Sequence, residues 1–303
     1  MRILLVEDSA VDRQKVEDCL KEWQLDYIAL ADGEEALALL EDPSPPNMAL
    51  LDWVLPGMDG IELCRKIRAL SLHGTYIYTV MLTGKNRKQD LLTAMEAGAD
   101  DYLAKPVNAS ELRARILVGK RILDLQQSLK FAATHDVLTD LYNRSEILAA
   151  LEREFSRSGR EGRPAVVILA DIDHFKKVND SMGHAAGDAV LKEVARRLKM
   201  DLRPYDLVGR YGGEEFLIIL PGCGLQVGMR RANEIRTLVS KTPISTIFGS
   251  VSATVSMGVT MTASSMDHTV ADILLQADMA LYAAKKNGRN RVESSSAARG
   301  TTA

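Results

Sequence analysis

The sequence has few cysteines, little net charge and no long apolar run. Its three cysteines, Cys19, Cys64 and Cys223, stand far apart without CxxC spacing, which favours neither a disulfide framework nor a zinc site. A formal net charge of -3, from 38 basic and 41 acidic side chains, provides no overall attraction to nucleic acid or to anionic lipid. We therefore expect no nucleic-acid partner and no membrane partner, and any nucleotide must be held by a local site.

No stretch approaches the roughly 18 apolar residues that a membrane helix needs. The acids Glu7 and Asp8 follow the first residue too closely for a signal peptide. These absences predict a soluble, cytoplasmic protein. The 303 residues are enough for two domains of ordinary size, each with its own core.

The first domain is expected over residues 1–122, where short aliphatic runs alternate with amphipathic segments. The predicted strands cover 2–6, 26–30, 48–52, 77–82 and 101–104. The predicted helices cover 11–23, 34–41, 61–70 and 87–97. This alternation predicts a flavodoxin-like, doubly wound α/β domain, in which ligands bind outside the carboxyl ends of the strands.

A helical stalk is expected over residues 109–135, which contain no proline. Apolar residues recur there at helical spacing: Leu112, Ile116, Ile122, Leu125 and Leu129. An apolar stripe on a stalk usually requires a partner helix, which favours self-association.

The second domain is expected over residues 136–293 and the polar residues 294–303 as a disordered tail. Strands are predicted at 165–172 and 251–261, and a hairpin around Gly212 and Gly213. Helices are predicted at 188–200, 225–240 and 270–287. This irregular order is typical of an α+β domain with an antiparallel sheet.

Five chemically active side chains stand at the ends of the strands predicted in the first domain: Glu7, Asp8, Asp52, Thr83 and Lys105. Three carboxylates at one edge repel each other unless a divalent cation bridges them. With a hydroxyl and an ammonium group, they could transfer a phosphoryl group onto an aspartate. Helix caps and surface acids would explain any one of these residues but not all five together.

Nearly all of residues 1–122 closely resemble the receiver domain of two-component response regulators. The resemblance implies that Asp52 is the phosphoacceptor, that Glu7 and Asp8 form the acid pair with Asp8 a direct Mg²⁺ ligand, and that the carbonyl of Val54 is a further ligand. It also implies that Thr83 and Tyr102 form the switch pair, that Lys105 contacts the phosphate before a cis Lys105–Pro106 bond, and that a histidine kinase is a partner.

Two glutamates, Glu214 and Glu215, follow Gly212 and Gly213 in the motif GGEEF, directly before an apolar run. If Asp171 lies at a strand end beside this bend, it and Glu214 form a two-carboxylate clamp for Mg²⁺ on a triphosphate. The glycines would let the backbone turn sharply and approach a bulky ligand. A hairpin with a solvated acidic flank is the alternative.

Further residues fit a guanine nucleotide. Asn179 and Asp188 together suit the polar edge of guanine, and Lys285 and Arg289 could reach phosphates. Taken alone, the two basic residues also suit a helix C-terminus, and His184 suits a structural role.

Residues from Asp136 to Val292 match the GGDEF family of diguanylate cyclases, with the motif written here as GGEEF. The resemblance implies a palm-like fold that condenses two GTP into cyclic di-GMP with loss of two pyrophosphates, using Mg²⁺ or Mn²⁺. It implies metal binding by Asp171, the Ile172 carbonyl and Glu214; guanine recognition by Asn179 and Asp188, with His184 near the sugar; a phosphate loop lined by Phe175 and Lys176; phosphate contacts by Lys285 and Arg289; and deprotonation of the 3′-hydroxyl by Glu214 or Glu215.

One site holds one GTP, whose own 3′-hydroxyl cannot attack its own α-phosphorus in line. Two sites must therefore face one another, which predicts a homodimer whose pairing the receiver controls. The pair Arg203 and Asp206 stands five residues before the motif, as the family's inhibitory RxxD site does, so cyclic di-GMP is expected to bind there as an inhibitor; a surface ion pair is the alternative. Where relatives often place a second arginine this chain has Glu234, and Arg230, Arg231 or Arg236 are the candidate substitutes.

Two other functions remain open at this stage. The chain could be a catalytically silent receptor for GTP or cyclic di-GMP that signals through the stalk, which the acids Asp171, Glu214 and Glu215 and the base Lys285 argue against. It could also make a different cyclic dinucleotide, which Asp188 disfavours because it suits guanine.

Overall fold

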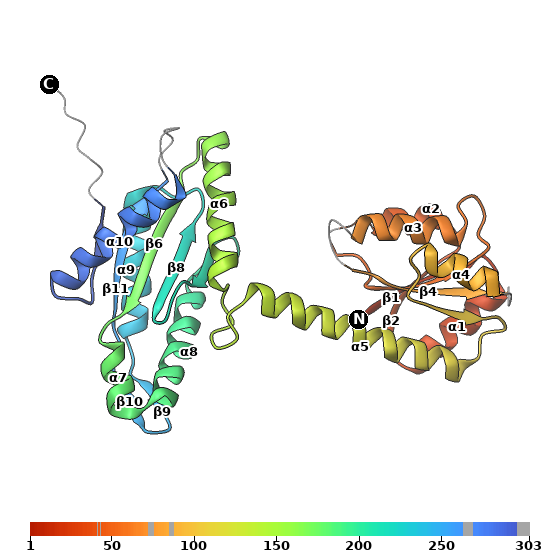
Figure 1. The fold of residues 1–303 in the computed structure, drawn as a ribbon, viewed down its shortest axis with the longest axis horizontal. Coiled ribbons are helices and arrows are strands. Elements are labelled where there is room, and N and C mark those ends of the chain that lie inside the picture. Colours follow the sequence, from red (N-terminus) through yellow and green to blue (C-terminus); the bar gives the residue numbers. More distant parts are fainter. Residues whose placement is uncertain (41, 43, 72–75, 85–87, 263–268, 296–303) are drawn as a thin grey trace. The chain divides into compact units, whose positions relative to one another are not determined.

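The chain forms two compact units, residues 1–129 and 130–303, in a computed structural model (Figure 1). The structure describes residues 1–40, 42, 44–71, 76–84, 88–262 and 269–295. Within this described part, no helix is both long enough and apolar enough to cross a membrane.

The first unit contains a five-stranded parallel sheet in the order β2-β1-β3-β4-β5. Its strands are β1 (Arg2–Val6), β2 (Asp26–Leu30), β3 (Met48–Asp52), β4 (Tyr78–Thr83) and β5 (Asp101–Ala104). Strands β3 and β4 are buried along their whole length, as expected for central strands covered on both faces. The predicted flavodoxin-like order is confirmed.

Helices cover both faces of this sheet: α1 (Ala10–Glu22), α2 (Gly33–Leu40), α3 (Gly60–Ser71), α4 (Lys88–Glu96) and α5 (Ala109–Thr134). Alternate residues of the strands belong to two separate apolar clusters, because successive side chains of a strand point to opposite faces. The helix predicted from residue 87 begins at Lys88, and residue 87 itself lies outside the described residues.

Helix α5 is continuous over 26 residues, and its apolar stripe divides into two parts. Leu112 and Ile116 are buried in the core of the first unit. In contrast, Leu125 is 58% exposed and Leu129 is 70% exposed, so the later part of the stripe has no covering element within the described chain. The stripe therefore serves as core at its start and as an uncovered apolar face toward its end.

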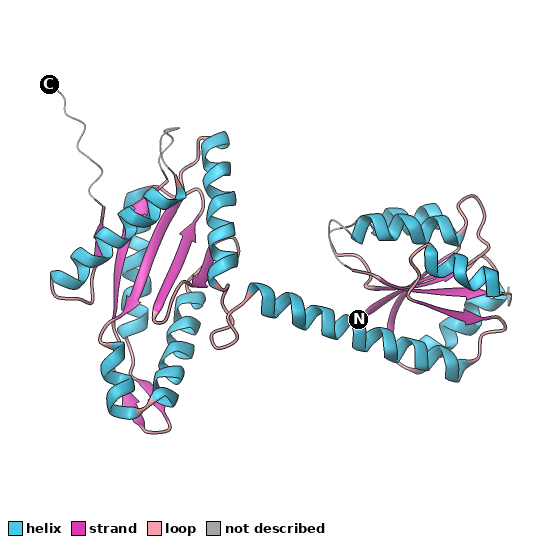
Figure 2. Ribbon diagram, in the orientation of Figure 1, coloured by secondary structure: helices cyan, strands magenta, loops and turns pink. Residues whose placement is uncertain are grey.

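The second unit contains a five-stranded sheet in the order β12-β11-β6-β8-β7, drawn in magenta in Figure 2. Its strands are β6 (Val166–Ile172), β7 (Leu207–Arg210), β8 (Glu215–Leu220), β11 (Val255–Met261) and β12 (Val292–Ser294). All neighbours are antiparallel except β11 and β12. The expected tail starts too early, because Ser294 is the last residue of β12 and the Ser295 N–H donates to the Val259 carbonyl at 2.9 Å; residues 296–303 lie outside the described part.

The single strand predicted over 251–261 is wrong. Strand β10 (Gly249–Val251) pairs with β9 (Ile244–Thr246) in a separate hairpin, and β11 begins only at Val255. Residues 252–254 lie between β10 and β11 and belong to neither strand. The Thr254 carbonyl there accepts a hydrogen bond of 2.9 Å from the Asp173 backbone N–H. A local apolar pattern does not reveal this tertiary bond.

After α5, the described residues of the second unit form five helices: α6 (Arg144–Glu161), α7 (Phe175–Met182), α8 (His184–Met200), α9 (Leu225–Ser240) and α10 (Val270–Lys286). Residues of α6 and α10 pack with one set of alternate strand residues, and residues of α8 and α9 pack with the other set (Figure 1). Helices α6 and α7 were not predicted, and α8 begins four residues before the helix predicted from 188. The sheet between two helical layers positions the loops at its edges.

Candidate functional site

The first candidate site lies at the carboxyl edge of the parallel sheet. Asp52 is the last residue of β3, and Glu7 and Lys105 directly follow β1 and β5. Lys105 Nζ lies 2.7 Å from Glu7 Oε2 and 2.8 Å from Asp52 Oδ2. The parallel topology thus brings together an ammonium group and two carboxylates that are about 50 residues apart or more in sequence, as predicted.

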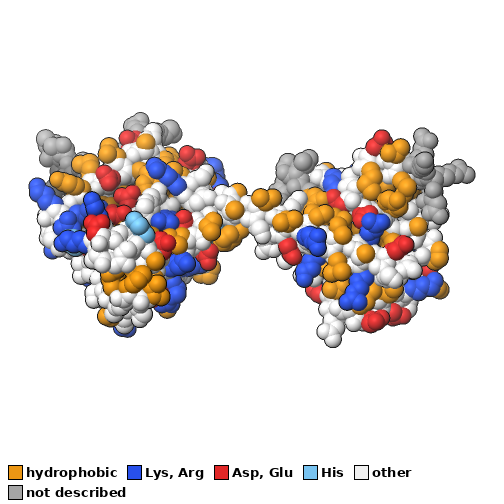
Figure 3. All heavy atoms as spheres, turned by 60° about the horizontal axis from the view of Figure 1, so that its bottom comes forward, with side chains coloured by type: hydrophobic (Ala, Val, Ile, Leu, Met, Phe, Trp, Pro, Cys, Tyr) orange, Lys and Arg blue, Asp and Glu red, His pale blue; other side chains and the backbone are white. Residues whose placement is uncertain are grey.

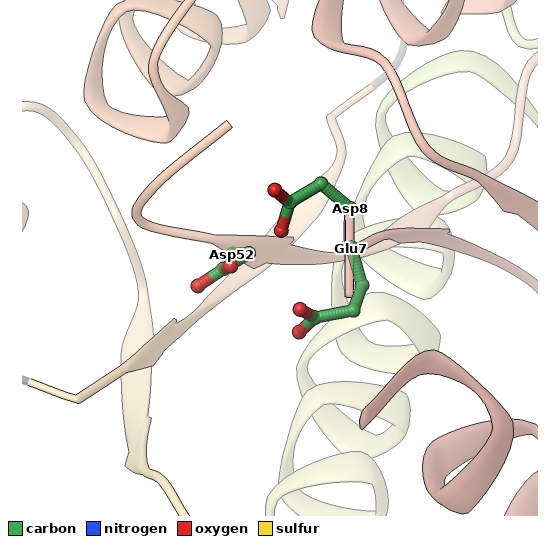
Figure 4. Close-up of side chains that lie close together, drawn as sticks. All are labelled: Glu7, Asp8 and Asp52. Atoms are coloured by element: carbon green, nitrogen blue, oxygen red, sulfur yellow. The ribbon is translucent and has the colours of Figure 1, made fainter. Parts of the chain in front are cut away.

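Asp8 completes this cluster. Glu7, Asp8 and Asp52 each contribute one carboxylate oxygen, and these oxygens all lie within 4.8 Å of one another (Figure 4). Burial raises the pKa of Glu7, and the hydrogen bond from Lys105 opposes this shift. Three converging carboxylates are a donor set of the kind that hard divalent cations prefer, so these residues fit Mg²⁺ or Mn²⁺.

The remaining receiver residues lie at the same edge or directly beneath it. Thr83 ends β4 and is buried, and its carbonyl accepts a hydrogen bond of 2.8 Å from the Lys105 N–H. Tyr102, in β5, lies opposite Met81 and packs against the same apolar cluster. Val54 is 63% exposed beyond the end of β3. The peptide bond between Lys105 and Pro106 is cis, as expected.

The second candidate site lies where β6 ends and the GGEEF turn joins β7 to β8. Asp171 lies directly opposite Glu215 in the antiparallel ladder, and the Ile172 N–H donates to the Glu214 carbonyl at 3.3 Å. Directly opposite side chains of an antiparallel pair are close neighbours on one face. The structure therefore places Glu215 across from Asp171, with Glu214 one position away in the turn.

Lys285, on α10, compensates these acids. Its Nζ lies 2.8 Å from Asp171 Oδ2, and the Asp171 side chain is only 9% exposed. Burial raises the pKa of Asp171, while the hydrogen bond from Lys285 lowers it. Burial also raises the pKa of Glu215, and the charge of Asp171 adds to that shift. Asp171 and Glu215 are thus two desolvated carboxylates beside one ammonium group, which is chemistry that can bind a divalent cation.

The turn itself is held by an arginine that the sequence analysis did not select. The guanidinium of Arg210 donates to the Gly213 carbonyl at 2.8 and 3.1 Å and lies 3.1 Å from the Asp136 carboxylate. A Cβ at Gly212 would lie 2.9 Å from the Glu215 carboxylate, whereas the space beside Gly213 is open. Neither glycine is in the left-handed region, so φ does not require glycine at either position; the nearby Glu215 carboxylate favours it at 212, whereas the open space at 213 would admit a side chain.

The expected nucleotide-binding residues are divided between α7 and α8, which meet at Gly183. Phe175, Lys176 and Asn179 belong to α7, and His184 and Asp188 to α8. Phe175 is buried, whereas Lys176, His184 and Asp188 are exposed.

Gly187 was missed by the sequence analysis. A Cβ at this position would overlap the Asn179 side-chain oxygen and lie 3.1 Å from the Phe175 ring. Glycine at 187 therefore permits the side chain of Asn179 to lie against α8.

Arg289 lies in the turn that follows α10. Its side chain is exposed, and its positive charge lowers the pKa of Asp171, so it lies within electrostatic range of the acid pair. The face of each unit shown in Figure 3 carries charges of both signs, in agreement with the small net charge.

The RxxD segment lies beside a cavity of about 350 Å³ whose lining includes Arg203, Asp206, Lys199, His135 and Tyr142. The Arg203 N–H donates to Asp206 Oδ2 at 2.9 Å, and the Arg203 guanidinium donates to the Tyr205 hydroxyl at 2.8 Å.

Of the three arginines considered for the missing second position, Arg231 lies nearest to this segment. It is 4.0 Å from Asp206 and 3.0 Å from Asp201. Arg230 instead pairs with Glu234, and Arg236 contacts Asn290.

The first unit combines a parallel sheet with a cluster of acids and a lysine at its carboxyl edge, which is typical of a receiver domain. The second unit combines a largely antiparallel sheet with acids on a glycine turn, which is typical of a cyclase domain. Residues 133–291 match the family model "Diguanylate cyclase, GGDEF domain", and residues 3–117 match "Response regulator receiver domain". The chain belongs to the GGDEF family and carries an N-terminal receiver domain.

Among curated proteins, the chain is 33% identical over 301 residues to the response regulator PleD of Caulobacter vibrioides, covering 96% of this chain and 65% of PleD. It is 37% identical over 188 residues to the diguanylate cyclase DosC of Escherichia coli, covering 60% of this chain and 40% of DosC. The chain therefore spans less than two thirds of the length of these relatives.

Among solved structures, the coiled coil and GGDEF domain of DgcB from Caulobacter crescentus, in complex with c-di-GMP, is similar with a TM-score of 0.56 and 31% identity. The match covers 61% of this chain and 97% of that one.

Proposed function

We propose that this protein is a phosphorylation-controlled diguanylate cyclase that condenses two GTP into cyclic di-GMP and two pyrophosphates. The observation that carries the proposal is the arrangement of Asp171 and Glu215 across one ladder position, with Lys285 2.8 Å from Asp171, at the edge of the GGEEF turn. Two desolvated carboxylates beside one ammonium group are suited to hold metal ions on a triphosphate, which supports metal-assisted catalysis.

In this proposal Asp171, the Ile172 carbonyl and Glu214 hold Mg²⁺ or Mn²⁺. The metal ions would neutralise charge on the triphosphate and favour departure of pyrophosphate. Asn179 and Asp188 bind the guanine edge with His184 near the sugar, and Phe175 and Lys176 line the phosphate loop. Lys285 and Arg289 contact the phosphates, and Glu214 or Glu215 removes the proton of the 3′-hydroxyl. The raised pKa of Glu215 brings that carboxyl nearer to the value that suits a general base.

Two sites must face each other, so a homodimer is part of the proposed chemistry. The uncovered leucines of α5, Leu125 and Leu129, lie on one helical stripe, and such a stripe is buried when two α-helices pair. Phosphorylation of Asp52 by a histidine kinase, with Mg²⁺ at Glu7, Asp8 and Val54, would change this pairing through Thr83 and Tyr102. The proposed regions are the receiver at 1–122, the stalk at 109–135 and the cyclase at 136–293.

Product inhibition belongs to the same proposal. Cyclic di-GMP would bind at Arg203 and Asp206, and Arg231 would substitute for the second arginine because it lies beside Asp206. Arginine guanidinium groups are suited to the guanine edge and phosphates of a cyclic dinucleotide, and binding by Arg231 would replace its contacts with Asp201 and Glu234.

The test uses the purified full-length chain with GTP and Mg²⁺, with and without a small phosphodonor, followed by identification of the product. Cyclic di-GMP that increases with the phosphodonor supports the proposal. The Asp52→Asn variant is expected to bind a GTP analogue as the parent does but to lose the increase, and equal activation of both proteins would refute receiver control. Binding of GTP or cyclic di-GMP without turnover would instead identify a receptor.

A further inference from the structure

Two aspartates stand two residues apart at the end of β6, and the structure uses them differently. Asp171 pairs with Lys285, whereas Asp173 is only 7% exposed and accepts hydrogen bonds from other parts of the chain. Its donors are the Thr254 hydroxyl at 2.6 Å, the Ser256 hydroxyl at 2.6 Å and the Asn290 backbone N–H at 3.0 Å. Three donors that converge on one buried carboxylate indicate a residue that joins separate segments.

The segment of greatest interest is the turn that follows α10. Gly288, Arg289 and Asn290 have successive φ values of 116°, 62° and 46°. Two non-glycine residues in the left-handed region are energetically unfavourable, so such a turn persists only where surrounding contacts hold it. The bond from the Asn290 N–H to Asp173 is one of these contacts.

Other bonds hold the same turn from its far side. Arg236 donates to the Asn290 carbonyl at 3.1 Å and to its side-chain oxygen at 2.7 Å, and the Arg289 N–H donates to the Ala284 carbonyl at 3.0 Å. Asp173 is the member of this set that connects the turn to β6, the strand that carries Asp171. Its position therefore links Arg289 to the acid pair.

We propose that Asp173 is a positioning residue that holds the turn 288–290 so that Arg289 faces the phosphates bound beside Asp171. This inference rests on the proposed cyclase function, in which Arg289 contacts the triphosphate. Asp173 stands two residues after Asp171, and its carboxylate accepts a hydrogen bond of 3.0 Å from the backbone N–H of Asn290, the residue next to Arg289. Displacement of a positioned group by about 1 Å can lower a rate constant by roughly a hundredfold.

Asp173 is not proposed as a metal ligand. Its Oδ2 accepts two of the hydrogen bonds and its Oδ1 accepts the third, so both oxygens are already engaged. Asp171, by contrast, has one charged partner on the neighbouring helix and faces the turn that carries Glu214. In this proposal Asp171 faces the substrate, and Asp173 holds the turn 288–290 that carries Arg289.

The test compares Asp173→Ala, Asp173→Asn and Arg289→Ala, with Asn287→Ala as the matched control. Asn287 is exposed at the end of α10 and its side chain bonds only Glu293 among the described residues. The first measurement is amide hydrogen exchange of residues 288–291 in the full chain, because loss of a holding bond accelerates local opening. We expect exchange at Asn290 to accelerate roughly tenfold or more in Asp173→Ala, to change less in Asp173→Asn, and to be unchanged in the control.

The second measurement is steady-state kinetics with GTP. We expect Asp173→Ala to raise KM roughly tenfold to a hundredfold with a smaller change in kcat, and we expect the Asp173→Ala/Arg289→Ala double variant to resemble Arg289→Ala alone. Asp173→Asn keeps the side-chain volume and one acceptor, so it should be intermediate; it replaces Asp173→Ala if that variant does not fold.

Unchanged exchange at Asn290, or KM effects of the two substitutions that simply multiply, would overturn the inference. The exchange measurement needs no turnover. A parent protein that makes no cyclic di-GMP would therefore refute the proposed function. Amide hydrogen exchange at Asn290 would still test whether Asp173 holds the turn.

Discussion

Replacing Lys285 with methionine tests the electrostatics of the acid pair directly. Methionine preserves most of the length and apolar volume of lysine but removes the ammonium group that lies 2.8 Å from Asp171 Oδ2. A hydrogen bond to a charged group contributes roughly 1.5–3 kcal/mol, and the partial exposure of Lys285 reduces this contribution through solvent screening. We therefore expect the free energy of unfolding of the second unit to fall by about 1–2 kcal/mol at pH 7.5, which corresponds to roughly 2–8 °C in Tm.

The pH dependence follows from the direction of the Asp171 shift. Burial raises the pKa of Asp171 above its ordinary 3.8. Ionised Asp171 therefore lowers the free energy of unfolding at pH values above its folded pKa, and this destabilisation disappears as the pH falls below 3.8. Lys285 offsets that destabilisation only while Asp171 is ionised. The loss in Lys285→Met should therefore be largest near neutral pH and should shrink as the pH falls toward 3.8.

The assay is urea unfolding followed by far-UV circular dichroism and by tryptophan fluorescence at several pH values. Both tryptophans, Trp23 and Trp53, belong to the first unit, so the fluorescence transition is an internal control that should not move. Lys286→Met, the same change at the next and exposed residue, is the matched control. A loss that is equal in both variants, or that grows on acidification, would refute the reasoning.

Three further predictions follow from single contacts. Gly187→Ala should raise KM for GTP about tenfold because the new Cβ displaces Asn179, and unchanged kinetics would contradict this assignment. Arg203→Ala keeps the backbone bond to Asp206 but removes the guanidinium, so the inhibition constant for cyclic di-GMP should rise about tenfold or more; unchanged inhibition in initial-rate assays would exclude this site. The hydrogen bond from Arg196 lowers the pKa of Glu193 to about 2, so Glu193 stabilises the fold above pH 4.5 and this contribution disappears as the pH falls toward 2. Glu193→Gln should therefore lower stability by about 1 kcal/mol at pH 7, after allowance for solvent screening, and thermal melts at pH 7 and pH 3 should show the difference narrowing.

Local patterns in the sequence predicted the first unit closely. Each predicted strand begins and ends within one residue of the observed one, because apolar runs bounded by polar residues are a local signal of buried parallel strands. Parallel strands share one carboxyl edge, so the meeting of Glu7, Asp52 and Lys105 followed from strand order alone.

The second unit shows where local patterns were insufficient. Helix α6 is rich in charged residues along its exposed side. Its apolar residues are recognisable as a buried face only once they are seen packed on the sheet. The strand predicted over 251–261 is interrupted because residues 249–251 pair with β9 in a hairpin, whereas β11 begins at Val255 and pairs with β6. The pairing of Asp171 with Glu215 depends on the strand register, which the spacing of acids along the chain does not reveal.

By itself, the sequence indicated the candidate residues: the acids and lysine at the strand ends of the first unit, the GGEEF motif, and the basic residues Lys285 and Arg289 at the end of α10 and in the turn after it. Only the tertiary structure decided which of them touch. It assigned Lys285 to Asp171, Arg210 to the GGEEF turn, Arg231 to the RxxD segment and Asp173 to the turn that carries Arg289. The physical reason is that side-chain periodicity is set by neighbouring residues, whereas contacts across strands and helices are set by register and packing of segments far apart in the chain.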